Sequence, residues 1–345
     1  MIYLNKKSSF MLIVFFTSLL ALVISGAEAG GRYAGASLEL GVGARPMALG
    51  SAAAAMSGGI ENFYYNPAAL TSLKKSHVHL MYAPTFGKLT DPLATYHYAG
   101  FAYPLPVGGT LSLNWTRFSV DDIPIYPQLK GSSFTDRNQN LELRPDGVAL
   151  GYFRDVEDVV YFTFAKPVRF DLPLGWLYLD LPVEIPLGFN VKVIRQLLYT
   201  SRANGMGVDL GAMIRFNLGT LFENKSLGDL TIGFSGHDIT QTTIAWSTQH
   251  DDHIRRTILV GMAYQHHLPF YDSHLNLFWS EANKYGTEHL FGMEFVMKNI
   301  ALRIGKNDAG LTAGAGLNFW KVVLDYAFVT TDFENVHRVS CAFTL

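Results

Sequence analysis

Apolar and polar side chains alternate with a period of two from about residue 77 onward. The alternation comes in segments of about ten residues, separated by short runs of turn residues. In the C-terminal segment one face carries Val339, Cys341, Phe343 and Leu345, and the other carries Arg338, Ser340, Ala342 and Thr344. Because successive side chains of a strand point to opposite sides, this pattern predicts strands with one apolar face and one small, polar face.

The alternation predicts fourteen strands in an antiparallel meander. Their expected ranges are 76–86, 94–105, 109–120, 148–166, 183–198, 204–217, 228–247, 254–268, 273–283, 287–297, 299–306, 310–319, 321–330 and 334–345. An even number of strands is typical of single-chain bacterial outer-membrane barrels. We therefore predict an all-β fold, a 14-stranded antiparallel transmembrane β-barrel over residues 76–345, with its apolar face toward the lipid of the outer membrane.

Three connections in this scheme are long. The stretches 167–182 and 218–227 fall on the periplasmic side, where turns are usually short. The stretch 119–146 falls on the extracellular side and is the longest irregular segment. A loop of that length is usually functional or disordered, and the sequence does not decide between the two.

The N-terminal segment predicts export. Lys6 and Lys7 precede an apolar run over 10–24, and the small residues of 25–29 then provide a cleavage site before Gly30. This order is typical of a secretory signal peptide, which we assign to residues 1–29. An uncleaved anchor is the alternative, but the apolar run is shorter than the roughly 20 residues of a spanning helix. Export favours the membrane barrel over a soluble β-sandwich, which would show the same alternation.

Residues 30–75 differ from the strands that follow. Arg45-Pro46 begins a run of good helix formers, and Pro46 is acceptable in the first turn of a helix. Asn66 can cap a second short helix in which Pro67 takes the first position. The segment therefore predicts a compact helical element, which would act as a plug or hatch if it lay inside the barrel.

The composition of the chain argues against several classes of protein and of functional site. The 27 basic and 29 acidic residues give no basic excess for binding nucleic acid. After the N-terminal segment, the sequence has no apolar run of about 18 residues, which argues against a helical membrane protein. The single cysteine, Cys341, cannot form an internal disulfide. His77 and His79 share a strand face without a third ligand, so we predict no metal site. We also predict no cofactor, no catalytic residues and no enzyme activity.

Charged residues on the lumen-facing side predict ion pairs. A two-residue turn at Lys298-Asn299 would place Glu294 directly opposite Arg303. Asp325 and Arg338 lie on the lumen face of a later hairpin, so we expect them to pair in the same way. We expect these pairs to neutralise charges inside the barrel.

Both ends of the chain resemble a known family. The run GARPMALGSAAAAMSGGIENFYYNPAAL looks like the N-terminal signature of FadL-like outer-membrane proteins. The last hairpins, with the glycine-rich strand near 310–319 and the Leu-Asp-Tyr-Ala of the next strand, are similar to the PorV/PorQ branch. The resemblance implies a fourteen-stranded barrel with a hatch that includes Arg45, Pro46, Asn66 and Pro67. Leu345 departs from the pattern, because such barrels often end in an aromatic residue.

The resemblance implies two functions. PorV-type members are implicated in type IX secretion, so secretion-system components or secreted proteins would be the partners. FadL-type members take up long-chain fatty acids or other hydrophobic small molecules through the hatch. The branch likeness favours the PorV-type function, and the FadL-type channel is the alternative. A barrel with a structural role and no transport is a third possibility.

Overall fold

The computed structural model describes residues 34–88, 90–126, 133, 135, 149–175, 179–331 and 335–345. The predicted signal peptide and its cleavage site before Gly30 lie outside the described residues. Most of the predicted 119–146 loop lies outside them as well.

Fourteen antiparallel strands form a closed barrel. They are β1 (His77–Lys88), β2 (Asp91–Pro104), β3 (Thr110–Ile125), β4 (Gly151–Leu174), β5 (Leu179–Leu198), β6 (Ser201–Asn217), β7 (Asp229–His237), β10 (Thr257–Leu268), β11 (Ser273–Asn283), β12 (Thr287–Met297), β13 (Ile300–Asn307), β14 (Gly310–Phe319), β15 (Val322–Val329) and β16 (Val336–Thr344). Each pairs with its neighbours, and β1 pairs with β16, where Leu80 lies opposite Cys341. The predicted 14-stranded barrel is confirmed.

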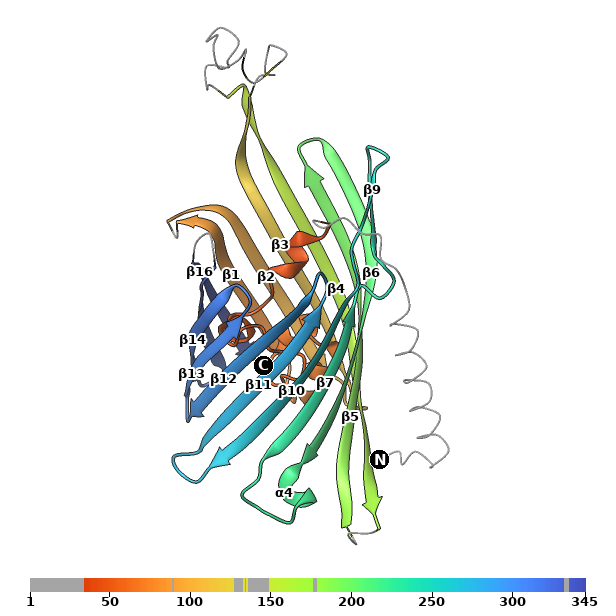
Figure 1. Cartoon of the computed structure of the whole chain (residues 1–345), viewed down its shortest axis with the longest axis vertical. Helices are drawn as coiled ribbons and strands as arrows, with labels where there is room; N and C mark the ends of the chain where they lie inside the picture. The colour runs from red at the N-terminus through yellow and green to blue at the C-terminus, as the bar shows by residue number, and fades with distance from the viewer. Residues whose placement is uncertain are drawn as a thin grey trace.

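The barrel wall is uneven in height. Figure 1 shows the β3–β4 hairpin rising far above the other strands at the upper end, and the short helix α4 (Leu218–Leu221) at the lower end. β4 has 24 residues, whereas β13 and β15 have eight each. A separate hairpin of β8 (Thr243–Trp246) and β9 (Asp251–His253) extends from the upper part of β6.

Several predicted boundaries are wrong. The expected strand 228–247 ends at His237, because Asp238 takes a positive φ of 52° and its backbone N–H donates to Asp209. The expected long connection 167–182 is mostly strand, since β4 continues to Leu174 and β5 begins at Leu179. The first part of the 119–146 stretch is also strand: β3 continues to Ile125 after a register shift between Val120 and Ile123.

The outer face of the barrel is apolar. Leu302, Leu311 and Val339 are all more than half exposed, although their strand neighbours point into the protein. In a soluble sandwich these side chains would form the core, whereas a lipid-facing wall leaves them uncovered by protein. The chain is therefore a transmembrane β-barrel of the kind found in outer membranes.

The helices among the described residues are all short. None of the helices in the described part of the chain is long and apolar enough to cross a membrane.

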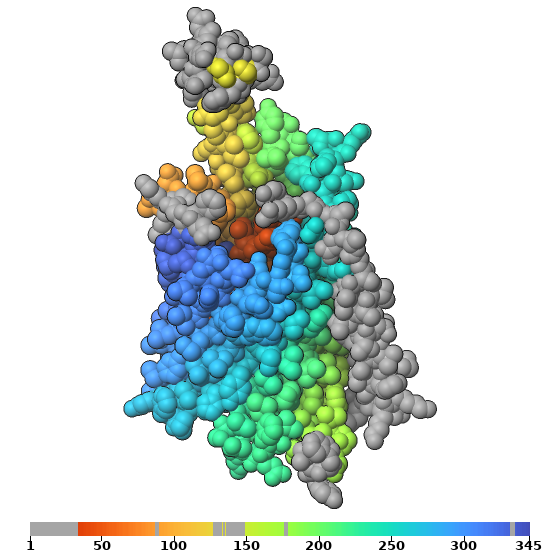
Figure 2. Space-filling view, in the orientation of Figure 1, coloured from red at the N-terminus to blue at the C-terminus, as the bar shows by residue number. Residues whose placement is uncertain are grey.

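The hatch, residues 34–75, lies inside the barrel. It contains four short helices, η1 (Ala36–Glu39), α2 (Ala44–Ala48), η2 (Ile60–Tyr64) and η3 (Pro67–Ser72). Figure 1 shows these red and orange elements enclosed by the strands, and Figure 2 shows the red segment at the upper mouth of the barrel. Many of its side chains, including Leu49, Met56 and Phe63, are fully buried.

Glycines of the wall let the hatch backbone come close. On seven strands a glycine faces the hatch, and we call this set the glycine girdle: Gly188, Gly211, Gly233, Gly261, Gly292, Gly305 and Gly314. A Cβ added at Gly188 would lie 2.6 Å from the backbone nitrogen of Ala68, and one at Gly292 would lie 2.7 Å from the carbonyl oxygen of Leu49. On β11, Ser280 takes this place and accepts a hydrogen bond of 3.2 Å from the backbone N–H of Ala54.

The glycine girdle predicts a stability cost for any added side chain. A Cβ at Gly233 would overlap the carbonyl oxygen of Ala54, so we expect Gly233→Ala to destabilise the protein by about 1–3 kcal/mol, the usual cost of overpacking. The matched control is Gly151→Ala in β4, where an added Cβ meets nothing within 4 Å. Denaturant unfolding of both variants in detergent measures the difference. Equal stability of the two variants would contradict the close packing.

Candidate functional site

A large cavity lies beneath the hatch. It has a volume of about 1670 Å³, and we call it the vestibule. Its lining extends down to the turns at Pro106–Gly108 and Lys298–Asn299, so it lies in the lower half of the barrel. The hatch provides its ceiling with Arg45, Ser57, Gly58, Gly59, Ile60 and Glu61.

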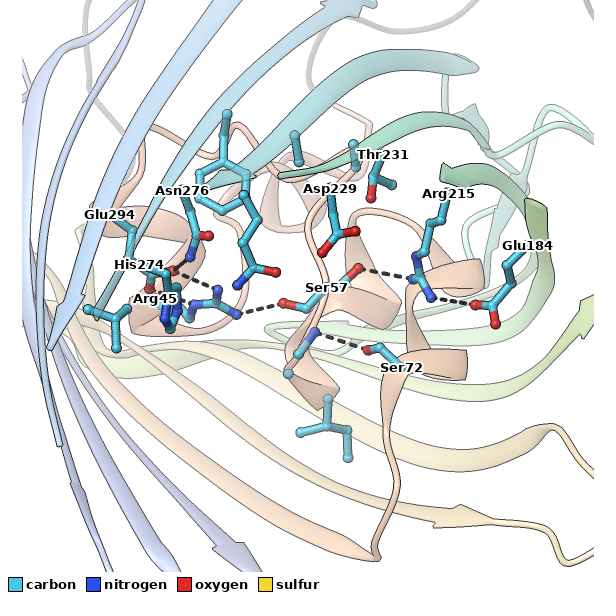
Figure 3. A pocket seen from close by; sticks show the side chains of 18 of the residues that line it. Arg45, Ser57, Ser72, Glu184, Arg215, Asp229, Thr231, His274, Asn276 and Glu294 are labelled. Atoms are coloured by element: carbon cyan, nitrogen blue, oxygen red, sulfur yellow. Dashed lines mark hydrogen bonds and ion pairs between the residues drawn. The ribbon is translucent and has the colours of Figure 1, made fainter. Parts of the chain in front are cut away.

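A chain of polar groups crosses the ceiling of the vestibule. Arg45 forms two contacts with Glu294 on β12, at 2.9 and 2.8 Å, and donates to the carbonyl oxygen of Ser57 at 2.8 Å. On the other side, Arg215 of β6 donates to Ser57 Oγ at 3.0 Å and to Glu184 of β5 at 2.9 Å. Figure 3 shows this chain, which we call the polar strut. It ties the hatch loop at Ser57 to two separate parts of the wall.

Glu294 is the centre of a larger buried network. Its carboxylate, only 1% exposed as a residue, accepts hydrogen bonds from Arg45, Arg303 and Asn276. Arg303 lies directly opposite Glu294 in the β12–β13 register, with Nε 2.8 Å from Oε1. The same guanidinium reaches Asp325 at 2.6 Å. Two arginines and two carboxylates therefore balance one another inside the barrel, as buried charges require.

The expected pair between Asp325 and Arg338 is not formed. In the register of β15 and β16, Arg338 lies opposite Ala327, and Asp325 lies opposite Ser340. The two residues are thus offset, and Asp325 pairs with Arg303 instead. Arg338 donates to the carbonyl oxygens of Gly41, at 2.6 Å, and Leu40, so it holds the start of the hatch rather than a wall carboxylate.

The residues assigned to the hatch hold its bends in place. Asn66 caps η3 by accepting from the Ala68 N–H at 3.1 Å, and its amide donates to the carbonyl oxygen of Ala54 at 2.7 Å. Pro67 takes the first turn of η3. Pro46 is buried within α2, beside Arg45.

Glu61 and His79 form a second contact between hatch and wall. Glu61 Oε2 lies 3.0 Å from His79 Nδ1 of β1, and both residues line the vestibule. Burial alone would raise the pKa of the Glu61 carboxyl, but His79 and Arg45 together lower it to about 2. Burial also works against the charge of Arg45, but Glu294 raises the pKa of that guanidinium above its ordinary value. Both hatch groups are therefore held in their charged forms.

A third buried cluster was not predicted from the sequence. Lys192 of β5 lies 2.9 Å from Asp209 of β6 and 2.8 Å from Asp238, which follows β7. All three are almost completely buried, and Thr242 donates to Asp238 at 2.6 Å. The cluster fixes the turn that leads into β8. The sequence signal that could have indicated this cluster was Lys192, a lysine among the apolar residues of the predicted strand 183–198.

Within the described ranges, no three histidine, cysteine or acidic side chains are grouped so that they could bind a metal ion.

Comparisons with known proteins return only remote likenesses. No protein-family model matches the sequence, and no curated protein sequence does. Among solved structures, the toluene transporter TbuX of Ralstonia pickettii is 13% identical, with a TM-score of 0.42 over 88% of this chain and 97% of that one. The outer membrane protein Omp33 of Acinetobacter baumannii is 8% identical, with a TM-score of 0.41 over 79% and 98%. The fold assignment therefore rests on the strand register of the chain itself.

The buried network predicts a large effect of neutralising Glu294. Glu294→Gln leaves Arg45 and Arg303 without their shared charge, so we expect a loss of about 3–5 kcal/mol in the free energy of unfolding. The matched control is Arg117→Gln, because the Arg117 side chain is 44% exposed in its pair with Asp158. An exposed pair contributes only about 0.2–1 kcal/mol. Denaturant unfolding in detergent measures both, and a Glu294→Gln variant as stable as the control would contradict the network.

Proposed function

We propose that this chain is an outer-membrane barrel whose hatch controls the passage of small molecules. The observation that carries the proposal is the vestibule, a cavity of about 1670 Å³ that reaches the lower turns and ends at the hatch. A purely structural plug needs no such half-channel beneath it. The arrangement supports a closed state in which the route is complete except for the hatch.

The chemistry around the hatch favours hydrophobic molecules, as in a FadL-type channel. Above the vestibule, Phe63 packs among Tyr98 and Tyr161 with ring centroids 5.8 and 5.1 Å apart. A molecule that displaces these rings has to replace apolar contacts, which a hydrophobic molecule does best. The same proposal includes that a signal peptide exports the chain and that the barrel lies in the outer membrane.

The pairing of β5 with β6 favours the release of a bound molecule sideways through the barrel wall. The register between β5 and β6 pairs Glu184 with Arg215 and Leu187 with Ala212, and it skips Ile185 and Pro186. Proline has no N–H to donate, so the ladder is weakened there. Residues on both sides of the break line the vestibule. An opening at this point would break the Arg215–Glu184 contact but few hydrogen bonds of the strand ladder.

A second candidate, protein cargo handling of the PorV type, is favoured by the upper hairpin. β3 and β4 rise well above the barrel in Figure 1, and Tyr126, Leu150 and Tyr152 on this hairpin are all more than half exposed. Exposed aromatic and apolar groups are common in protein-binding surfaces. Secretion-system components or secreted proteins would be the partners in this case.

The two candidates are separated by purifying the protein from its native membrane in mild detergent. Mass spectrometry then identifies what remains bound. The transport proposal expects a fatty acid or another hydrophobic molecule without a stoichiometric protein partner. A stoichiometric secreted protein or secretion component would overturn it in favour of the PorV-type function.

The proposal also predicts that a weakened hatch increases flux. Asn66→Ala with Pro67→Ala removes a helix cap and three hydrogen bonds of the Asn66 amide, to the carbonyl oxygens of Ala54, Ala212 and Phe234, while the residues of the wall strands stay unchanged. Loss of a cap alone costs about 1 kcal/mol, and about 1.4 kcal/mol changes a population tenfold. We therefore expect the rate of small-solute entry into proteoliposomes to rise several-fold over the unchanged protein. The Arg117→Gln variant is the control, and equal rates in all three proteins would contradict hatch gating.

A further inference from the structure

The hatch contacts the wall in two different ways. Along the strands from β5 to β14, its backbone lies against the glycine girdle and Ser280. Thr312 of β14 adds two hydrogen bonds of 2.9 Å there, one from the N–H of Gly50 and one to the carbonyl oxygen of Ala48. Rotating the Ser280 or Thr312 side chain does not open this side, because the hatch backbone still lies against the wall at Gly188, Gly233 and Gly292.

Large side chains fill the interface on the opposite side, from β1 to β4. His79 on β1, Tyr98 on β2 and Tyr161 on β4 all point toward the hatch and are at most 2% exposed. Phe63 of the hatch packs between Tyr98 and Tyr161. Here the separation between hatch and wall is set by rings, which turn about their χ angles without any movement of the backbone.

These rings form a continuous column from the vestibule to the upper face of the hatch. His79 lines the vestibule, and its ring lies 5.3 Å from that of Tyr98. Phe63 follows above Tyr98, and Tyr64 lies 6.1 Å from Phe63. The Tyr64 hydroxyl donates to the carbonyl oxygen of Leu38 in η1, the element at the upper mouth of the barrel.

The polar contacts of the column are few. The Tyr98 hydroxyl donates to Asn114 Oδ1 at 3.0 Å, and the Phe63 side chain has no polar atoms. Moving these two rings therefore costs one hydrogen bond and leaves no charge unpaired, whereas moving the hatch away from β12 or β13 would break the contacts of Glu294. The column is the easiest boundary to open.

We propose that the hatch stays fixed to the β5–β14 side and that the passage opens on the β1–β4 side, with Phe63 and Tyr98 as the gate residues. This proposal rests on the proposed function of hatch-controlled passage. It assigns the two rings a positioning role: they decide whether the vestibule connects with the upper mouth.

The test compares aromatic truncations on the two sides. Phe63→Ala with Tyr98→Ala shortens the column, and Phe278→Ala on β11 removes a buried ring that lies against the hatch on the girdle side. Above Phe278 the strand presents Ser280 to the backbone of Ala54, so the lumen stays closed there after truncation. Ion conductance in planar lipid bilayers is measured for each full-length protein in potassium chloride.

The expected result is a one-sided leak. The double variant conducts at least about tenfold more than the unchanged protein, which corresponds to about 1.4 kcal/mol of lost closure. Phe278→Ala stays at the unchanged level, whereas Tyr98→Phe, which keeps the ring and loses only the hydrogen bond to Asn114, conducts less than the double variant. Equal leaks from the double variant and from Phe278→Ala would overturn the proposal. The proposal would also be overturned if the double variant stayed closed while the Asn66→Ala, Pro67→Ala protein conducted ions.

Two further measurements keep the result interpretable. The heat-dependent mobility of the barrel in gels shows whether each variant is folded. Should the double variant not fold, Tyr98→Leu is used, which retains most of the buried volume and is expected to give a smaller increase of the same sign; no increase would overturn the proposal. The double variant could leak although the unchanged protein transports no hydrophobic solute. This result would support the one-sided opening and overturn the proposed transport function.

Discussion

The backbone of the hatch lies directly against the barrel wall, and the rest of the structure depends on this contact. It is possible because glycine occupies the facing position on seven strands, so that the residues near Ala54 and Leu49 come within contact distance of the sheet. The contact fixes the height of the hatch in the lumen. The position of the hatch then sets the ceiling of the vestibule and brings Arg45 to Glu294. A barrel with side chains at these positions would have to hold the hatch elsewhere or exclude it.

The buried charges follow from that position. Removing charges from water is costly unless partners satisfy them, and two buried charged groups on the hatch meet partners on the wall: Arg45 meets Glu294, and Glu61 meets the His79 ring. Such pairs add specificity more than stability, because they fit only one placement of the hatch. Apart from the Glu61–His79 contact on β1, the side of the hatch toward β1–β4 is filled by aromatic rings, which tolerate small movements. One interface is thus rigid and the other is adaptable.

The strands could be predicted well from the sequence because a strand with one apolar and one polar face has a period of two. This holds whether the apolar face meets lipid or a protein core. Glu294 opposite Arg303 followed from a two-residue turn at Lys298. The offset of Arg338 did not, because the register of β15 and β16 depends on a longer connection and on hatch carbonyls that the pattern does not reveal. The extension of β4 beyond residue 166 was missed because Pro167 and Pro173 suggest a break, yet both prolines lie in the strand. The glycine girdle is scattered over seven strands, so only three-dimensional pairing brings it together.

Hydrogen–deuterium exchange of the full-length protein in lipid nanodiscs shows whether the hatch is fixed to the wall on one side only. The two informative peptides cover residues 44–56, which lie along the glycine girdle, and 57–66, which include Phe63. A hatch fixed on one side predicts that the amides of 44–56 exchange as slowly as those of the neighbouring wall strands, while those of 57–66 exchange faster. Rapid exchange over 44–56, or equal rates in both peptides, would contradict a hatch that is fixed on one side only.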